Sequence, residues 1–228
     1  MDFPKLSDLE LRQPPRGWTR RWNNLNQPQA LADRELRLKT AINFLRANTP
    51  ELAHGTPGVV LDLYPVSGEL LEVARYLQHA VVGLLSPVLG NKEAASRQLC
   101  ERQGIGICDL TLDNLLVTTA PQQMFMDTYG SECRAIILRD GFEVVFSSIC
   151  RYKQSGAIRL RIDESTQATL QNFFAGMQQL LAASGILAMT LPPLANLVDA
   201  NTVIRELAKA EGLQLVRASD RQLKWRRN

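Results

Sequence analysis

Short apolar runs alternate with longer amphipathic stretches along most of the chain, and this alternation limits the fold more than any other feature. Gly58–Leu63 and Ala80–Leu85 are almost continuously apolar and rich in valine, which is typical of strands buried on both faces of a parallel sheet. Between them, Glu69–Gln78 has apolar residues at helical spacing. Strands that alternate with helices predict a doubly wound α/β fold.

The alternation continues to the end of the chain. Further helices are expected at Pro28–Ala47, at Leu89–Gln103, at Glu164–Ser184 with Gly185 as its cap, and from a cap at Asp199 or Asn201 to Glu211. Further strands are expected at Ile105–Cys108, Phe142–Ser147, Ile186–Leu191, Leu213–Val216 and Gln222–Trp225. The last two strands are too close together for a crossover helix, so they should be antiparallel. The prediction is a mostly parallel, seven-stranded sheet with an antiparallel last strand.

Two connections are candidates for substrate-facing segments, because long loops in compact domains are usually functional. Leu110–Gly141 is the longer of the two, and it includes a candidate helix at Pro121–Tyr129 and a candidate strand at Arg134–Leu138. Arg151–Asp163 is the second. We expect an N-terminal basic segment and helix over 1–56, and an α/β domain over 57–228 with an insertion at about 110–141.

Composition and the distribution of apolar residues exclude several classes of protein. The chain has 228 residues, of which 45% are hydrophobic, so it can bury one sizeable core and does not resemble a disordered protein. No apolar run approaches the roughly 20 residues that cross a bilayer, so no membrane span is expected. Met1–Arg12 has acidic residues and no apolar stretch, so no secretory signal is predicted and the expected compartment is the cytoplasm.

Cysteines and histidines are few and widely spaced. The four cysteines are Cys100, Cys108, Cys133 and Cys150, and none forms a CxxC pair. We therefore expect reduced, mostly buried thiols and no metal site. The two histidines, His54 and His79, exclude a three-histidine metal site and leave few candidates for Ser-His or Cys-His catalysis.

Basic residues gather at the two ends of the chain, although the net charge is only +3. Leu11–Ala32 holds four arginines without an acid, and Leu215–Asn228 holds five basic residues against Asp220. Trp18 and Trp22 lie in the first segment, and Trp225 lies in the second. Such ends can contact RNA through phosphates and stacked bases, or they can be solvated ends anchored to the body by their tryptophans.

The first strand, turn and helix read VVLDLYPVSGELLEVARYL. This stretch resembles the first motif of the class I S-adenosylmethionine-dependent methyltransferases, in which an acid ends the strand and a glycine-rich turn approaches the cofactor. The order of later segments over Pro57–Arg217 is similar too: VVGLL as second strand, ICDLTLDNL as third, FEVVFSSI as fourth and SGILAMTLPP as fifth. The resemblance implies a Rossmann-like methyltransferase fold with S-adenosylmethionine as cofactor.

The resemblance also implies roles for single residues. Asp62 would support the turn and the amino acid end of the cofactor, and Gly68 would allow close packing where the helix begins. Asp109 would accept a hydrogen bond from the adenine amino group, with Leu110 beside the ring. Ser147, together with Ser148, would lie near the methyl donor and acceptor at the end of the fourth strand. The implied cofactor-binding residues are Asp62, Tyr64, Ser67, Gly68, Leu85, Asp109, Leu110 and Ser147.

The chain departs from the family pattern at three positions. Tyr64 and Val66 stand where the family has glycine, and Leu85 stands where an acid binds the ribose. Tyr64 either fills the space that the lost glycine leaves or stacks on a ligand. Asp62 either supports the cofactor or only bonds the amides that follow it.

Two functions remain open at this point. One is methyl transfer to an unidentified acceptor, a small molecule or an RNA drawn to the arginine-rich ends. The other is a catalytically inactive methyltransferase-fold protein that binds a protein partner as a subunit of a larger complex. A dinucleotide enzyme is disfavoured, because the first turn lacks GxGxxG. No general base is assigned among the candidates Asp109, Asp140, Tyr152, Asp163 and Glu164.

Overall fold

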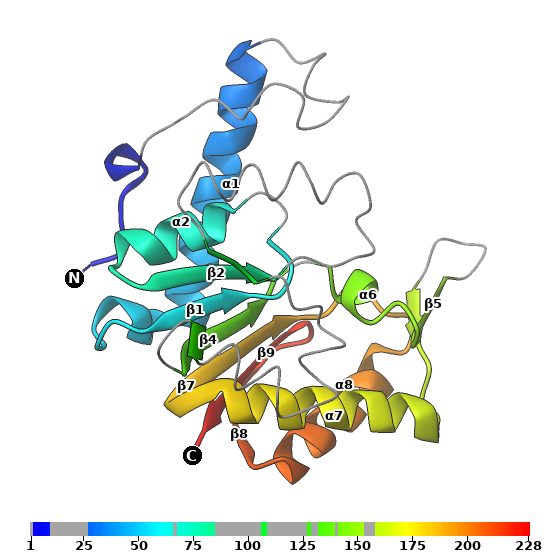
Figure 1. Cartoon of the computed structure of the whole chain (residues 1–228). Helices are drawn as coiled ribbons and strands as arrows, with labels where there is room; N and C mark the ends of the chain where they lie inside the picture. The colour runs from blue at the N-terminus through cyan, green and yellow to red at the C-terminus, as the bar shows by residue number, and fades with distance from the viewer. Residues whose placement is uncertain are drawn as a thin grey trace. The chain divides into compact units, whose positions relative to one another are not determined.

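The computed structural model divides the chain into two compact units, Met1–Asp109 and Leu110–Asn228 (Figure 1). The residues that it describes are 2–9, 27–65, 68–84, 106–108, 127–128, 132–139, 141–152 and 158–228. Several predictions lie outside these residues: the helix at Leu89–Gln103, most of the helix at Pro121–Tyr129, and the site residues Ser67, Leu85, Asp109 and Leu110.

The first unit begins with a short 3-10 helix, η1 (Leu6–Asp8), and a long helix, α1 (Gln27–Asn48). Helix α1 confirms the prediction, and one of its faces is buried through Leu38, Ala41 and Leu45. The helix ends where Pro50 begins a second 3-10 helix, η3 (Pro50–Ala53). Proline disfavours the helical conformation of the residue before it, which explains why α1 stops there.

Three parallel strands follow in the first unit: β1 (Val59–Asp62), β2 (Ala80–Leu84) and β3 (Gly106–Cys108). Their order is β3-β2-β1, and helix α2 (Glu69–Tyr76) connects β1 to β2. Each of these elements was predicted from its apolar pattern. In the register, Asp62 is paired with Gly83, so the acid lies at the carboxyl end of β1 beside the middle strand.

Four of the described strands in the second unit lie side by side in the order β4-β7-β9-β8. They are β4 (Cys133–Leu138), β7 (Leu181–Thr190), β8 (Leu213–Ala218) and β9 (Gln222–Arg227). Strands β4 and β7 are parallel, whereas β9 is antiparallel to both of its neighbours, as the short connection before it predicted. Helices α7 (Glu164–Leu180) and α8 (Leu197–Ala210) belong to the same unit.

A row of aromatic rings forms the core of the second unit. Phe142, Phe146, Phe173, Phe174 and Trp225 are buried, and successive ring centroids lie 4.7, 5.0, 5.3 and 5.5 Å apart. A separate antiparallel ribbon, β5 (Cys150–Tyr152) and β6 (Ile158–Leu160), precedes α7 in the chain.

The predicted strand at Phe142–Ser147 is wrong. These residues start with a short helix, α6 (Phe142–Val145), which follows Gly141 at φ 77°. Phe142 and Phe146 lie one helical turn apart and pack on each other, so the apolar pattern fits a helix as well as a strand. The strand that pairs with β7 is β4, inside the stretch expected to be an insertion. Ser147 is therefore an exposed turn residue after α6 and does not end a strand.

The predicted boundary between Ser184 and Gly185 is also wrong. Helix α7 ends at Leu180, and β7 begins at the next residue, Leu181. The first residues of β7 pair irregularly with β4, because the register shifts between Cys133 and Ala135 of β4. A Cβ atom on Gly185 would lie 2.8 Å from the carbonyl oxygen of Ala182 and 2.9 Å from that of Cys133. This glycine therefore permits a close backbone approach in the irregular strand instead of capping a helix.

The last helix begins earlier than predicted. Its N-cap is Asn196, so Asp199 lies in the first turn of α8. Asn201 lies further along the helix, where its side-chain nitrogen donates to the carbonyl of Asp220 at 2.8 Å. Gly212, at φ 78°, follows the last turn as predicted, because a left-handed residue after a helix favours glycine.

Among the described residues, no helix combines the length and apolar character that a membrane crossing needs.

Candidate functional site

The turn between β1 and α2 is the candidate cofactor site of the first unit. Asp62 ends β1 with a side chain that is 5% exposed, and its Oδ1 accepts a hydrogen bond of 3.0 Å from the backbone N–H of Tyr64. An aspartate that binds the amide two residues on fixes a tight turn. Gly68 precedes α2 at φ 77°, a conformation that is costly for residues with a Cβ atom. Asp62 thus bonds an amide that follows it, and Gly68 has the left-handed conformation that favours glycine; their roles toward a cofactor stay predictions.

This turn packs directly on β2. A Cβ atom on Gly83 would lie 2.8 Å from Cγ of Pro65 and 3.5 Å from Cδ1 of Leu71, so only glycine fits beneath the proline ring. Gly83 was not among the predicted site residues. The available signal was a glycine inside an otherwise apolar strand, which often marks a close backbone approach.

The described part of the turn bears on one of the three departures from the family pattern, because Val66 and Leu85 lie outside the described residues. Tyr64 stands at a position where the family has glycine, but the described non-glycine residues with positive φ are only Gln78 and Ser184. The backbone therefore does not need glycine at Tyr64, and the side chain of Tyr64 is half-buried. The buried acid at Asp62 and the left-handed glycine at Gly68 are both in place.

Carboxylates occupy the first turn of α2. Glu69 is 2% exposed and lies 3.0 Å from Nε of Arg37 and 3.6 Å from Nη1 of Arg34. Glu72 lies 2.7 Å from Nη2 of the same Arg34. Arginines of α1 therefore compensate both carboxylates, and these ion pairs hold α2 against α1.

Two of the candidate bases, Asp163 and Tyr152, have pKa shifts that oppose the uptake of a proton at neutral pH. Asp163 caps α7, and its hydrogen bond from the Thr166 amide, 2.9 Å long, lowers the pKa of its carboxyl group. Desolvation, followed by the charge of Glu143, raises the pKa of Tyr152. Glu164 is an exposed residue at the start of α7. Asp109 and Asp140 lie outside the described residues.

His79 and the described cysteines have structural surroundings. His79 is 3% exposed; its Nδ1 accepts from the Gly58 amide at 3.2 Å, and its Nε2 lies 2.8 Å from the carbonyl of Leu52. Cys133 and Cys150 are buried free thiols, as predicted. Burial, with the nearby Glu143 carboxylate, raises the pKa of Cys150 to about 12, so this thiol is not a nucleophile.

The basic C-terminal tail is built into the sheet. Trp225 is fully buried in β9 against Phe174, so it anchors the tail and is not available to stack on a base. Arg221 Nε donates to the carbonyl of Leu191 at 2.8 Å, and Arg227 donates to the carbonyl of Leu181. Trp18 and Trp22 lie outside the described residues.

Comparisons with known proteins agree with this geometry at the level of the fold. No protein-family model and no curated protein sequence matches the chain. Magnesium protoporphyrin IX methyltransferase from Synechocystis PCC 6803, solved with bound SAM, is similar over 92% of this chain and 89% of its own, with 13% identity and a TM-score of 0.53. A methyltransferase from Pyrococcus furiosus is similar over 84% of this chain and 83% of its own, with 11% identity and a TM-score of 0.50. The chain thus has the Rossmann-like α/β fold of the class I S-adenosylmethionine-dependent methyltransferases.

Proposed function

We propose that this protein binds S-adenosylmethionine at the turn between β1 and α2 and transfers its methyl group to an acceptor. The observation that carries the proposal is the buried Asp62 carboxylate at the end of β1, which holds the Tyr64 amide ahead of the left-handed Gly68. These are the features that the family resemblance predicted for the turn. The match in fold over 92% of the chain supports the same proposal.

The residues of the turn act by binding and orientation. Asp62 supports the amino acid end of the cofactor, directly or through water, and Gly68 lets the backbone turn into α2. The cofactor, when bound, supplies a methyl group that its sulfonium already activates. Alignment of the acceptor can then provide most of the rate enhancement, so the absence of an assigned base among the described residues is compatible with the proposal.

An inactive assembly subunit is the less favoured function. Trp225, in the basic C-terminal segment, is fully buried and is not available to contact a protein partner. The turn that carries Asp62 is closely packed, with Gly83 beneath Pro65.

Calorimetric titration of the full chain with S-adenosylhomocysteine, the demethylated product, tests the proposal. We expect micromolar affinity, a higher melting temperature with the ligand, and at least a tenfold weaker affinity in Asp62→Ala, because one hydrogen bond to a charged group contributes about 1.5–3 kcal/mol. Asp8→Ala is the matched control. It removes a carboxylate that accepts a backbone hydrogen bond of 2.7 Å from Lys5 in the same unit, away from the turn.

The control should bind the ligand as the natural chain does. No heat and no gain in melting temperature with either S-adenosylmethionine or S-adenosylhomocysteine at millimolar concentration would overturn the proposal.

A further inference from the structure

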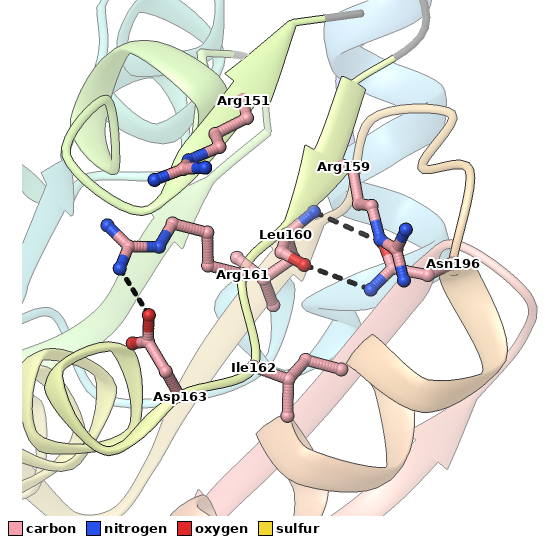
Figure 2. A pocket seen from close by; sticks show the side chains of 7 residues that line it. All are labelled: Arg151, Arg159, Leu160, Arg161, Ile162, Asp163 and Asn196. Atoms are coloured by element: carbon pink, nitrogen blue, oxygen red, sulfur yellow. Dashed lines mark hydrogen bonds and ion pairs between the residues drawn. The ribbon is translucent and has the colours of Figure 1, made fainter.

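The β5–β6 ribbon and the segment after β7 enclose a pocket of about 360 Å³ within the second unit (Figure 2). The segment is bonded to the ribbon: the Ala195 amide donates to the carbonyl of Ile158 at 2.8 Å, and the Asn196 side chain bonds both the N–H and the C=O of Leu160, at 3.1 and 2.9 Å. Because this segment starts at the carboxyl end of β7, the pocket lies beyond that end. Ligands of open α/β sheets bind in this position.

Three arginines line the pocket: Arg151, Arg159 and Arg161. Arg151 and Arg159 are directly paired across the antiparallel ribbon. Leu160 is fully buried, so Arg159 and Arg161, on either side of it, project from the opposite face of the chain. Figure 2 shows the Arg151 and Arg161 side chains extending to one side of the ribbon and the Arg159 side chain extending to the other side, toward Asn196.

The charge of this cluster is poorly compensated. Arg161 forms an ion pair with Asp163, the only carboxylate that lines the pocket. Within the described ranges, no hydrogen bond or ion pair joins the guanidinium of Arg151 or Arg159 to another residue. Like charges placed directly opposite each other destabilise an antiparallel pair. A bound anion would remove this repulsion.

We propose that this pocket binds the phosphate or carboxylate group of a small molecule. Guanidinium groups bind both anions through paired, charge-assisted hydrogen bonds, and the volume suits a small ligand. The cations gather in one pocket, whereas RNA binding needs a basic track along the backbone. The tail residues Arg221 and Arg227 already bind backbone carbonyls.

Calorimetric titration of the full chain with inorganic phosphate, with citrate and with a single-stranded RNA oligomer, all at one ionic strength, tests the proposal. We expect phosphate or citrate to bind at one site, with affinity falling about tenfold for each guanidinium removed in Arg151→Gln and Arg159→Gln. Arg75→Gln is the matched control, because Arg75 is an exposed arginine on α2, in the other unit. Arg151 and Arg159 are both exposed, so the two variants should fold, and melting curves would check this.

Binding of phosphate alone supports a phosphate ester as ligand, and binding of citrate alone supports a carboxylate. Three results would overturn the proposal: neither anion binds at millimolar concentration, both arginine variants bind the anion as tightly as the natural chain, or only the RNA binds. S-adenosylhomocysteine is titrated in parallel. If S-adenosylhomocysteine fails to bind while the anion binds, the proposed function is refuted and the anion site is supported. If S-adenosylhomocysteine binds while the anion does not, only the anion site is refuted.

Discussion

Replacing Gly83 with alanine should disturb the proposed cofactor turn through a single steric contact. The new Cβ atom would lie 2.8 Å from Cγ of Pro65, whereas ordinary contacts begin at 3.4 Å, so the proline must move by about 0.6 Å. The proline ring is rigid and belongs to the turn that carries Asp62. Overpacking of this kind costs about 1–3 kcal/mol of stability.

The same substitution should also weaken ligand binding. A displaced turn misplaces the Asp62 carboxylate, and we expect the affinity for S-adenosylhomocysteine to fall by about tenfold or more, or about 1.4 kcal/mol. Calorimetry measures the affinity, and urea unfolding measures the free energy of unfolding. In a chain of this size, each kcal/mol should also lower the melting temperature by about 2–4 °C.

Gly212→Ala is the matched control for this experiment. Gly212 has φ 78°, so alanine is strained there, but a Cβ atom would meet nothing within 4 Å. The substitution should cost about 1 kcal/mol of stability, since the left-handed conformation is disfavoured for L-residues, and should leave ligand affinity unchanged. If Gly83→Ala kept the natural stability and affinity, the close packing of Pro65 on β2 would be refuted.

Three further substitutions test other parts of the structure. Glu69→Ala should cost about 1–3 kcal/mol in urea unfolding, because it removes a buried carboxylate that pairs with Arg37 and Arg34, while Arg34 keeps Glu72; a neutral effect would contradict the buried ion pairs. Trp225→Ala should cost about 3–5 kcal/mol in the same assay, and a near-neutral effect would contradict the position of this ring in the core. Folding raises the pKa of Cys150 from 9.0 to about 12, so the folded state keeps a proton that the unfolded state loses. Stability should therefore fall as the pH rises above 9.0, and Cys150→Ala should flatten that dependence; identical profiles for the two chains would refute it.

Much of the fold could be predicted from the sequence, because its elements are encoded locally. The apolar runs that became β1 and β2 and the helical spacing that became α1 and α2 need no long-range information. The antiparallel direction of β9 followed from a connection too short for a crossover. The turn at Asp62 was found because an acid, a loop and a glycine follow a buried strand.

The errors arose where two patterns fit equally well. Phe142–Ser147 and Cys133–Leu138 are both short apolar segments, and only the left-handed Gly141 and the packing of Phe142 on Phe146 make the first of them helical. The role of Gly185 depends on the carbonyl of Cys133, which is distant in sequence. The role of Gly83 likewise depends on the position of Pro65 in the folded chain, which the hydrophobic periodicity does not indicate.

The arginine pocket could not be predicted for the same reason, although Arg151–Asp163 was selected as a candidate segment. Its chemistry depends on register: pairing Arg151 with Arg159 places two cations directly opposite each other, and a shift by one residue would turn every side chain to the other face. Compensation of charge separates this cluster from the other charged cluster that the structure describes. Glu69 and Glu72 in the first turn of α2 are paired with Arg34 and Arg37, so that cluster is neutral. Within the described ranges, the guanidiniums of Arg151 and Arg159 have no carboxylate partner, so the ribbon is the cluster that favours an anionic ligand.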